Sequence, residues 1–201
     1  MTNMFTHKNY ILASSSKSRS KILKSCGFRF IQIKPVCNEE EIKKKIKTKK
    51  RPAQIAKILS FEKAKSVSKT KKFFEELVIG CDTIIYLDNQ VFDKAKDIKE
   101  AKKKIKLLSG KFHKIVSAIT ICRRGKRVWE CSETTRVKIR NLKPHEIDEY
   151  LKRAGSQILE SVGCYQLEKL GPQIIEDVYG DFFNVMGLPL FKLLKHVSKE
   201  L

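Results

Sequence analysis

The stretch Leu77-Val-Ile-Gly-Cys-Asp-Thr-Ile-Ile-Tyr-Leu87 carries an aspartate in the middle of an apolar run. Apolar runs that are rich in β-branched residues predict buried strands. A carboxylate inside such a strand is costly unless it is paired, hydrogen-bonded or bound to a metal, so Asp82 would need a partner there. The other interpretation is that Asp82 forms a turn between two strands, 77–80 and 83–87. The sequence alone leaves both interpretations open.

Upstream of this stretch, the chain predicts a strand, a tight turn and a helix. The apolar run Tyr10–Ala13 predicts the strand, and the serines at 14–16 predict the turn. Apolar residues recur at helical spacing after the turn, and Gly27 can end that helix. A second strand is expected at 28–33. The almost wholly cationic stretch 43–51 is expected to be an exposed loop or helix face.

A longer helix is expected from Pro52 to about Ser68, with Glu62 and Lys63 on its polar side. A capping box, Asp97-Ile-Lys-Glu100, predicts the start of another helix. The remaining elements follow from turn residues and periodicity. They are a hairpin with arms 114–122 and 127–131, a further strand at 137–140, and helices at 144–155 and 191–197.

This alternation of strands and helices around a central hairpin predicts an α/β fold built on a mixed sheet. We find no internal repeat and no linker in the 201 residues, so one domain spanning 1–201 is expected. No stretch approaches the roughly 20 apolar residues that a membrane-spanning helix needs. We therefore expect no membrane partner.

The charge balance is the unusual feature of the composition. The chain has 43 Lys and Arg against 22 Asp and Glu, a formal net charge of +21. Such a surface attracts polyanions, which include nucleotides and nucleic acids. Because lysine is spread along the whole chain, solvated helix faces explain the excess better than a dedicated nucleic-acid surface.

The six cysteines form no Cys-x-x-Cys pair, so we expect no zinc site. The N-terminal residues lack the apolar segment of a secretory signal. The missing secretory segment favours a reducing compartment for the thiols, and we expect the protein in the cytoplasm.

The serine-rich turn after the first strand is a candidate phosphate site. A helix N-terminus offers backbone N–H groups and a favourable dipole to an anion, and Ser14, Ser16 and Arg19 would add hydroxyls and a positive charge. Taken alone, the serines are better explained as helix caps, since the chain has neither a Walker-type loop nor a dinucleotide-binding turn.

Several short motifs occur in a fixed order along the chain. They are Ser16-x-x-Arg19, Glu39, Glu62-Lys63-Ala64, Gly80-Cys81-Asp82-Thr83, Lys94 with Asp97, Leu108-Ser109-Gly110 before His113, and Gly187-Leu188-Pro189. No single motif is specific, but their order and spacing are, and together they resemble the Maf family of nucleoside triphosphate pyrophosphatases. The resemblance spans residues 11–194, and the stretches 161–168 and 180–183 look especially like alphaproteobacterial members.

The resemblance implies an inosine-triphosphatase-like fold, with an elongated mixed sheet flanked by helices and two lobes around a nucleotide cleft. It implies hydrolysis of a nucleoside triphosphate to the monophosphate and pyrophosphate, with Mg²⁺ or Mn²⁺, as a house-cleaning activity on the nucleotide pool. It also implies a homodimer. The alternative is a basic nucleic-acid-binding or cell-division regulatory protein without turnover.

The resemblance also assigns roles to residues. Asp82, Glu39 and Lys94 would be catalytic, and Asp82 and Glu39 would also hold the metal. These types suit the reaction, because attack of water on the α-phosphorus needs a proton acceptor and places charge on the leaving pyrophosphate. The family's usual proton acceptor is the aspartate, but the sequence does not apportion the two carboxylates. Substrate binding would fall to Ser14, Ser16, Arg19, Lys63, Thr83 and Glu168.

The chain departs from the family pattern at several positions. Ser16-Lys-Ser-Arg19 keeps only the second of the two usual arginines, and Lys94 is followed by alanine instead of proline. Glu168 matches members that act on 7-methyl-GTP, since members that act on dTTP and UTP have glutamine there. Thr83 matches the dTTP and UTP type instead. The base therefore stays open, with a preference for a modified purine.

Overall fold

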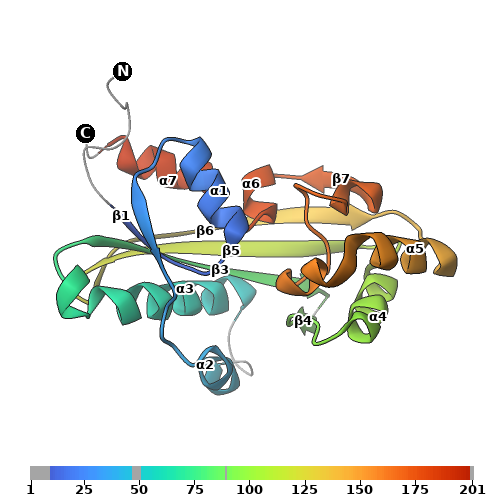
Figure 1. Ribbon diagram of the computed structural model, residues 1–201, viewed down its shortest axis with the longest axis horizontal. Helices are drawn as coiled ribbons and strands as arrows, with labels where there is room; N and C mark the ends of the chain where they lie inside the picture. The colour runs from blue at the N-terminus through green and yellow to red at the C-terminus, as the bar shows by residue number, and fades with distance from the viewer. Residues whose placement is uncertain (1–9, 47–50, 89, 200–201) are drawn as a thin grey trace. The chain divides into compact units, whose positions relative to one another are not determined.

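The computed structural model describes residues 10–46, 51–88 and 90–199. Their strands form one mixed sheet in the order β2-β1-β3-β5-β6-β7, with β4 paired to β3 (Figure 1). β1 is parallel to both β2 and β3, whereas β4 is antiparallel to β3 and β7 is antiparallel to β6. The predicted α/β class with a mixed sheet is confirmed. The strands are β1 Tyr10–Ala13, β2 Phe30–Ile33, β3 Leu77–Leu87, β4 Gln90–Phe92, β5 Phe112–Arg123, β6 Lys126–Ile139 and β7 Ile175–Tyr179.

Helices accompany the strands along the whole described chain. Three of the α-helices begin where the sequence indicates a cap, at Ser16, Arg51 followed by proline, and Asp97. The α-helices are α1 Lys17–Ser25, α2 Glu39–Ile46, α3 Pro52–Ser68, α4 Ile98–Leu108, α5 Pro144–Ala154, α6 Phe182–Val185 and α7 Leu190–Val197, and the 3₁₀ turns are η1 Lys71–Phe73, η2 Gly155–Glu160 and η3 Gly171–Gln173.

The chain divides into two compact units. The first comprises Met1–Asp82, Ser117–Glu133 and Gly187–Leu201, and the second comprises Thr83–Val116 and Thr134–Met186. Whether the chain behaves as the single domain expected from its sequence stays a prediction.

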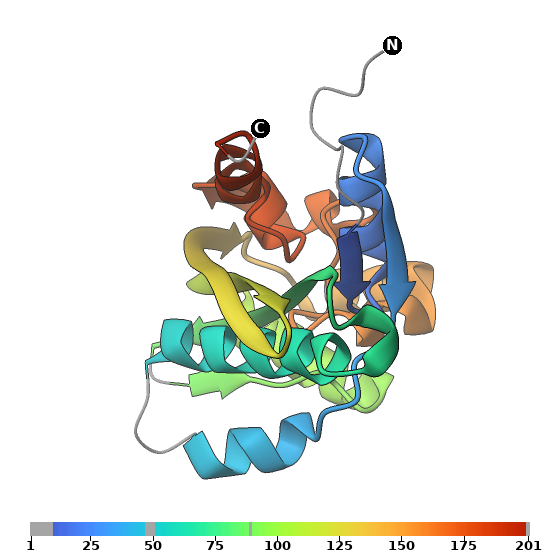
Figure 2. The same ribbon diagram turned by 90° about the vertical axis from the view of Figure 1, so that its left-hand side faces the viewer.

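The first unit packs helices on both sides of its strands. In Figures 1 and 2, α3 runs along one side, while α1 and α7 lie on the other. The buried face of α3 meets the sheet in an apolar cluster that holds Ala64 and Val67 from the helix and Ile11 and Val78 from β1 and β3. This packing fixes the position of α3 relative to β3.

The second unit covers one face of its strands with α4 and α5. Ala101 and Ile105 of α4 and Leu151 of α5 share an apolar core with Val137 and Ile139 of β6. The alternate residues of these strands therefore point away from the helices, as strand geometry requires.

The structure differs from the sequence analysis in the bounds and the number of the strands. Residues 77–87 form one continuous strand, so Asp82 is not a turn residue. The predicted strand at 137–140 is the end of β6, which runs unbroken from Lys126 to Ile139. β7 lies outside every predicted element. The cationic stretch from residue 43 begins as the second half of α2, which agrees with the expected helix face, and 47–50 lie outside the described residues.

Candidate functional site

The structure places the partner of Asp82 on α3. The Lys63 ammonium donates to Asp82 Oδ1 at 2.6 Å, and both side chains are buried, 9% and 7% exposed. The prediction that Lys63 lies on the polar side of its helix is wrong. The apolar stem of a lysine can be buried when the ammonium finds a carboxylate, and periodicity alone does not reveal that partner.

Gly80 allows α3 to approach β3 closely enough for this pair. A Cβ at position 80 would lie 2.2 Å from the carbonyl oxygen of Ser60 and 2.6 Å from the backbone nitrogen of Ala64. No side chain fits there. The glycine two residues before Asp82 thus faces the helical turn that carries Lys63, and close backbone packing sets the distance between the two charged groups.

Glu39 supplies the second carboxylate. It is the first residue of α2, and its Oε2 lies 3.1 Å from the Lys63 ammonium, with the side chain 43% exposed. Lys63 therefore bridges a buried and a half-exposed carboxylate. The sequence predicted all three residues as site residues, and the structure brings them together.

Burial and charge shift the pKa values of this group. Burial raises the pKa of Asp82 above its usual value, although Lys63 and Arg19 oppose the shift. Burial works against the charge of Lys63, but Asp82 and Glu39 outweigh it and the pKa of Lys63 is raised. Asp82 is therefore a better proton acceptor than an exposed aspartate, while Lys63 stays cationic.

The two carboxylates form a donor set that suits a hard divalent cation. Asp82 Oδ2 is buried and has no hydrogen-bond partner among the described residues, so one oxygen is left to accept a proton or ligate a metal. In the described part of the chain, no group of three or more His, Cys, Asp or Glu side chains gathers as a protein-only metal site. Mg²⁺ commonly binds through one or two carboxylates together with substrate phosphates and water, so Asp82 and Glu39 fit such an ion.

The serine turn builds a second part of the site in the same unit. Ser16 caps α1 by accepting the Arg19 N–H at 3.3 Å. The Ser14 hydroxyl accepts from the backbone N–H of Ser16 at 3.2 Å and from Arg19 Nη1 at 3.1 Å. Ser16 therefore caps the helix, as one interpretation of the serines predicted. Ser14, Ser16 and Arg19 also cluster, as the other interpretation predicted.

Two residues that the sequence did not single out for this role hold the turn. The Arg19 Nε donates to the carbonyl of Gly187 at 2.8 Å, and the Gln32 amide donates to the carbonyl of Ser14 at 2.8 Å. In the sequence, Gly187 stands out only as part of a family motif, and its contact with Arg19 joins residues that are 168 positions apart. The pairing of a backbone carbonyl with a distant arginine leaves no periodic signal in a sequence.

The other three predicted residues belong to the second unit. Thr83 follows Asp82 on β3 and is half-buried. Lys94 is exposed in the segment between β4 and α4, and Glu168 is exposed in a turn that the Gly171 N–H closes onto the Gln166 carbonyl at 2.9 Å. Their assignment as site residues remains a prediction from the family resemblance.

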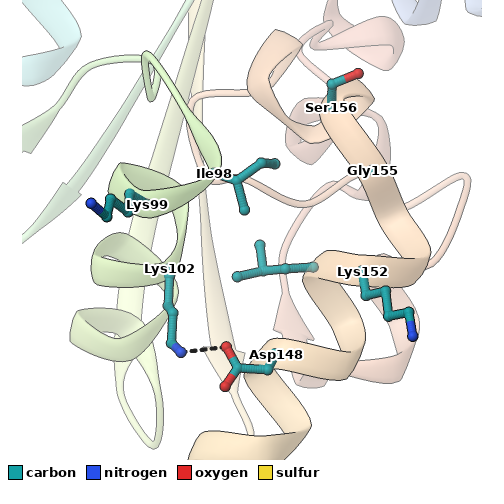
Figure 3. Close-up of a pocket in the computed structure, with 8 residues that line it drawn as sticks. Ile98, Lys99, Lys102, Asp148, Lys152, Gly155 and Ser156 are labelled. Atoms are coloured by element: carbon teal, nitrogen blue, oxygen red, sulfur yellow. Dashed lines mark ion pairs between the residues drawn. The ribbon is translucent and has the colours of Figure 1, made fainter.

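One groove of the second unit is lined by none of the predicted site residues. Figure 3 shows a shallow groove of about 450 Å³ between α4 and α5, lined by Ile98 and Leu151 with lysines at its rim. Its carboxylate, Asp148, is paired with Lys102. The groove offers no unpaired acid for catalysis.

His113 has a structural role in the second unit. Its Nε2 lies 2.5 Å from the Tyr165 hydroxyl, and the ring is 1% exposed. Burial lowers the pKa of His113 to about 4, so the ring is neutral near pH 7. A neutral, enclosed imidazole packs against its tyrosine and carries no charge to a substrate.

Comparisons with known proteins agree with the resemblance read from the motifs. In the described residues, we find no helix with the length and apolar character needed to cross a membrane. The chain is 41% identical over 184 residues to a 7-methyl-GTP pyrophosphatase from Bartonella henselae, covering 92% of this chain and 91% of the relative. It is 38% identical over 191 residues to a nucleoside triphosphate pyrophosphatase from Paramagnetospirillum magneticum, covering 94% and 97%. A model of Maf-like proteins matches residues 9–200, and the chain therefore belongs to the Maf family.

Proposed function

We propose that this protein is a nucleoside triphosphate pyrophosphatase that hydrolyses an acid anhydride bond to give a nucleoside monophosphate and pyrophosphate. The observation that carries the proposal is the buried Lys63, which lies between Asp82 and Glu39. The names and coverage of the relatives support the same activity.

The arrangement suits attack by water on the α-phosphorus. Asp82 would take the proton of the attacking water, because its Oδ2 has no other partner and its raised pKa makes it the stronger base. Lys63 and Arg19 would offset negative charge on the phosphates, and the turn at Ser14 and Ser16 would orient phosphate oxygens. Glu39 would hold Mg²⁺ or Mn²⁺ together with the substrate phosphates, since the unpaired oxygen of Asp82 serves as the proton acceptor, and the bound metal would supply further positive charge to the phosphates.

Within this class, we favour a modified purine such as 7-methyl-GTP. Three of the most similar relatives carry that name, and a carboxylate at Glu168 can pair with a cationic methylated base or accept from the donors of a guanine edge. Thr83, in contrast, matches the family members that act on dTTP and UTP, and therefore favours a pyrimidine base. We therefore treat the base as the property to be measured.

Two further features complete the proposal. All six cysteines carry free thiols, which supports a reducing compartment such as the cytoplasm.

The homodimer rests on the resemblance, and sedimentation of the full chain tests it: a mass of one chain would contradict the dimer.

Pyrophosphate release is the direct test of the activity. The full chain with Mg²⁺ or Mn²⁺ should release pyrophosphate from at least one of a panel of canonical and methylated nucleoside triphosphates. Asp82→Asn should lower the rate about 100-fold or more, as expected when a general base is lost. The control is Asp148→Asn, which removes an exposed, paired carboxylate and should leave the rate unchanged.

Lys94→Ala tests the predicted catalytic residue of the second unit. It should lower turnover with the fold intact, while Lys99→Ala on the exposed side of α4 should not. No turnover by the parent on the whole panel would contradict the proposed function. Equal rates for the parent, Asp82→Asn and Lys94→Ala would contradict the site.

Glu168→Gln tests the base. If Glu168 reads the base, the variant should change the order of preferred nucleotides, with the largest loss for the methylated purine. Glu160→Gln is the matched control, since Glu160 is also an exposed carboxylate of the second unit. A uniform change across the panel would show that Glu168 acts through general charge or structure instead.

A further inference from the structure

The second unit has a sheet face that its helices leave uncovered. Ile115, Val137 and Ile139 point into the core shared with α4 and α5. Their strand neighbours alternate to the other face. On that face lie aromatic and cationic side chains of four strands: Tyr86 of β3, Phe112 and Lys114 of β5, Arg136 and Lys138 of β6, and Tyr179 of β7.

These side chains form one connected cluster. The Arg136 guanidinium lies 4.6 Å from the Phe112 ring centroid and 5.9 Å from that of Tyr179, and the two rings lie 5.8 Å apart at 57°. The register of β6 and β7 places Arg136 directly opposite Tyr179. Lys138 lies 5.5 Å from the Phe112 centroid. Strand pairing thus places these side chains next to one another.

The aromatic rings of the cluster remain open to solvent. Phe112 is 38% exposed and Tyr179 is 53% exposed. Beside them is a hollow of about 360 Å³, lined among others by Tyr86, Lys114 and Arg136. Single exposed aromatics are ordinary, whereas contiguous exposed apolar surface often marks an interaction site.

On this face, some of the described charged side chains pair with a group of opposite charge and others do not. Glu176 pairs with Lys138 at 2.7 Å, and Asp177 accepts from the Tyr179 hydroxyl at 3.3 Å. Among the described residues, Lys114 and Arg136 contact aromatic rings and have no carboxylate partner. Asp88 is the carboxylate that lines the hollow. Two cations therefore remain to meet an anion beside the rings.

We propose that this face binds single-stranded nucleic acid without sequence preference. Proteins that do so combine aromatic side chains, on which bases stack, with cations that follow the phosphates. The Phe112 and Tyr179 rings would stack bases, and Lys114 and Arg136 would contact phosphates. The net charge of +21 would attract the strand, but the face would decide where it binds.

The test is the affinity of the full chain for a fluorescein-labelled ten-nucleotide single strand, measured by anisotropy over a range of salt concentrations. Phe112→Leu and Tyr179→Leu remove a stacking surface and keep the charge, and each should weaken binding roughly tenfold. Arg136→Gln should weaken binding and reduce the slope of log K against log salt by about 0.7, the value for one phosphate contact on a single strand.

Matched controls lie outside the face. Phe74→Leu removes an exposed phenylalanine of the first unit, and Lys99→Gln removes a cation of α4; both should bind within twofold of the parent. Thermal melts establish that each variant is folded, and Tyr179→Leu at the edge strand carries the test if Phe112→Leu unfolds.

Three results would overturn the proposal. The first is that the leucine variants at Phe112 and Tyr179 bind like the parent. The second is that inorganic polyphosphate of the same charge competes as well as the unlabelled strand, which would assign binding to charge alone. The third is that a nucleoside monophosphate competes as well per molecule as the strand, which would assign the hollow to a single nucleotide.

Discussion

Two lysine–aspartate ion pairs, one in each unit, have the same chemistry and opposite surroundings. Lys63 and Asp82 are 9% and 7% exposed, whereas Lys102 and Asp148 on α4 and α5 are 47% and 54% exposed (Figure 3). Both place an ammonium against a carboxylate. The burial of each pair, and not the ionic contact itself, decides how much the pair contributes to stability.

Burial makes the first pair costly to form and damaging to break. Each charge loses its hydration, and removal of one partner leaves the other uncompensated in a medium of low dielectric constant. The second pair stays in water, where attraction is weak and salt screens it. A buried ion pair whose residues belong to family motifs therefore points to a functional role, whereas an exposed ion pair does not.

The largest effect on stability should come from Lys63→Met. The substitution keeps the length of the side chain and leaves Asp82 without its nearest cation, so we expect a loss of about 3–5 kcal/mol at neutral pH. Chemical denaturation measures it. The loss should shrink as the pH falls, because Asp82 then becomes neutral; a loss that is independent of pH would contradict the buried-charge explanation.

His113 is a buried group that is neutral near pH 7, and a pH titration compares its effect on stability with that of the buried ion pair. The pKa of His113 is lowered from 6.5 to about 4, so this group favours folding fully above pH 6.5 and loses that contribution as the pH falls toward 4. The shift corresponds to about 3 kcal/mol. Denaturation of the parent and of His113→Gln between pH 7 and pH 4 should give a shallower pH dependence for the variant. Parallel curves would show that His113 is not the group responsible.

Gly80→Ala tests the packing that brings the buried pair together. The new methyl group would collide with the backbone of α3, and overpacking of this kind costs about 1–3 kcal/mol. Turnover should fall as well, since Lys63 moves with the helix. Gly155→Ala is the control: a Cβ there would meet no atom beyond its chain neighbours within 4 Å, but φ +64° with ψ −164° is a conformation that essentially only glycine adopts, so alanine should cost about 1–3 kcal/mol and leave turnover intact.

The smallest effect should come from Lys102→Ala in the exposed pair. We expect a change in the free energy of unfolding of at most about 0.5–1 kcal/mol, decreasing further in high salt. A loss comparable to that of Lys63→Met would remove the distinction between the two ion pairs.

Much of the fold could be predicted from local patterns. The strand at Tyr10–Ala13 and the helices Pro52–Ser68 and Ile98–Leu108 match the structure, because caps and apolar periodicity fix them within a few residues. β7 could not be predicted in this way. Its sequence, Ile-Glu-Asp-Val-Tyr, has only a weak apolar pattern, and its pairing with β6 holds it in place.

The site was predictable in its residues and not in its geometry. Ordered motifs singled out Glu39, Lys63 and Asp82, but periodicity placed Lys63 on a polar face, since a pattern does not register an ammonium buried against a carboxylate. The role of Gly187 as the acceptor for Arg19 was equally hidden. Contacts between distant backbone and side-chain atoms depend on the finished fold.

The hydrogen bond from Arg19 to Gly187 also sets the order of events during synthesis. The two residues are 168 positions apart, and at translation rates of about 5–20 residues per second the carbonyl follows the arginine by roughly 8–30 seconds. The Arg19 side chain cannot make this hydrogen bond until Gly187 has been synthesised. A polypeptide released before Gly187 would lack the carbonyl that accepts from Arg19 Nε, and Arg19 would keep only local contacts such as its hydrogen bond to Ser14.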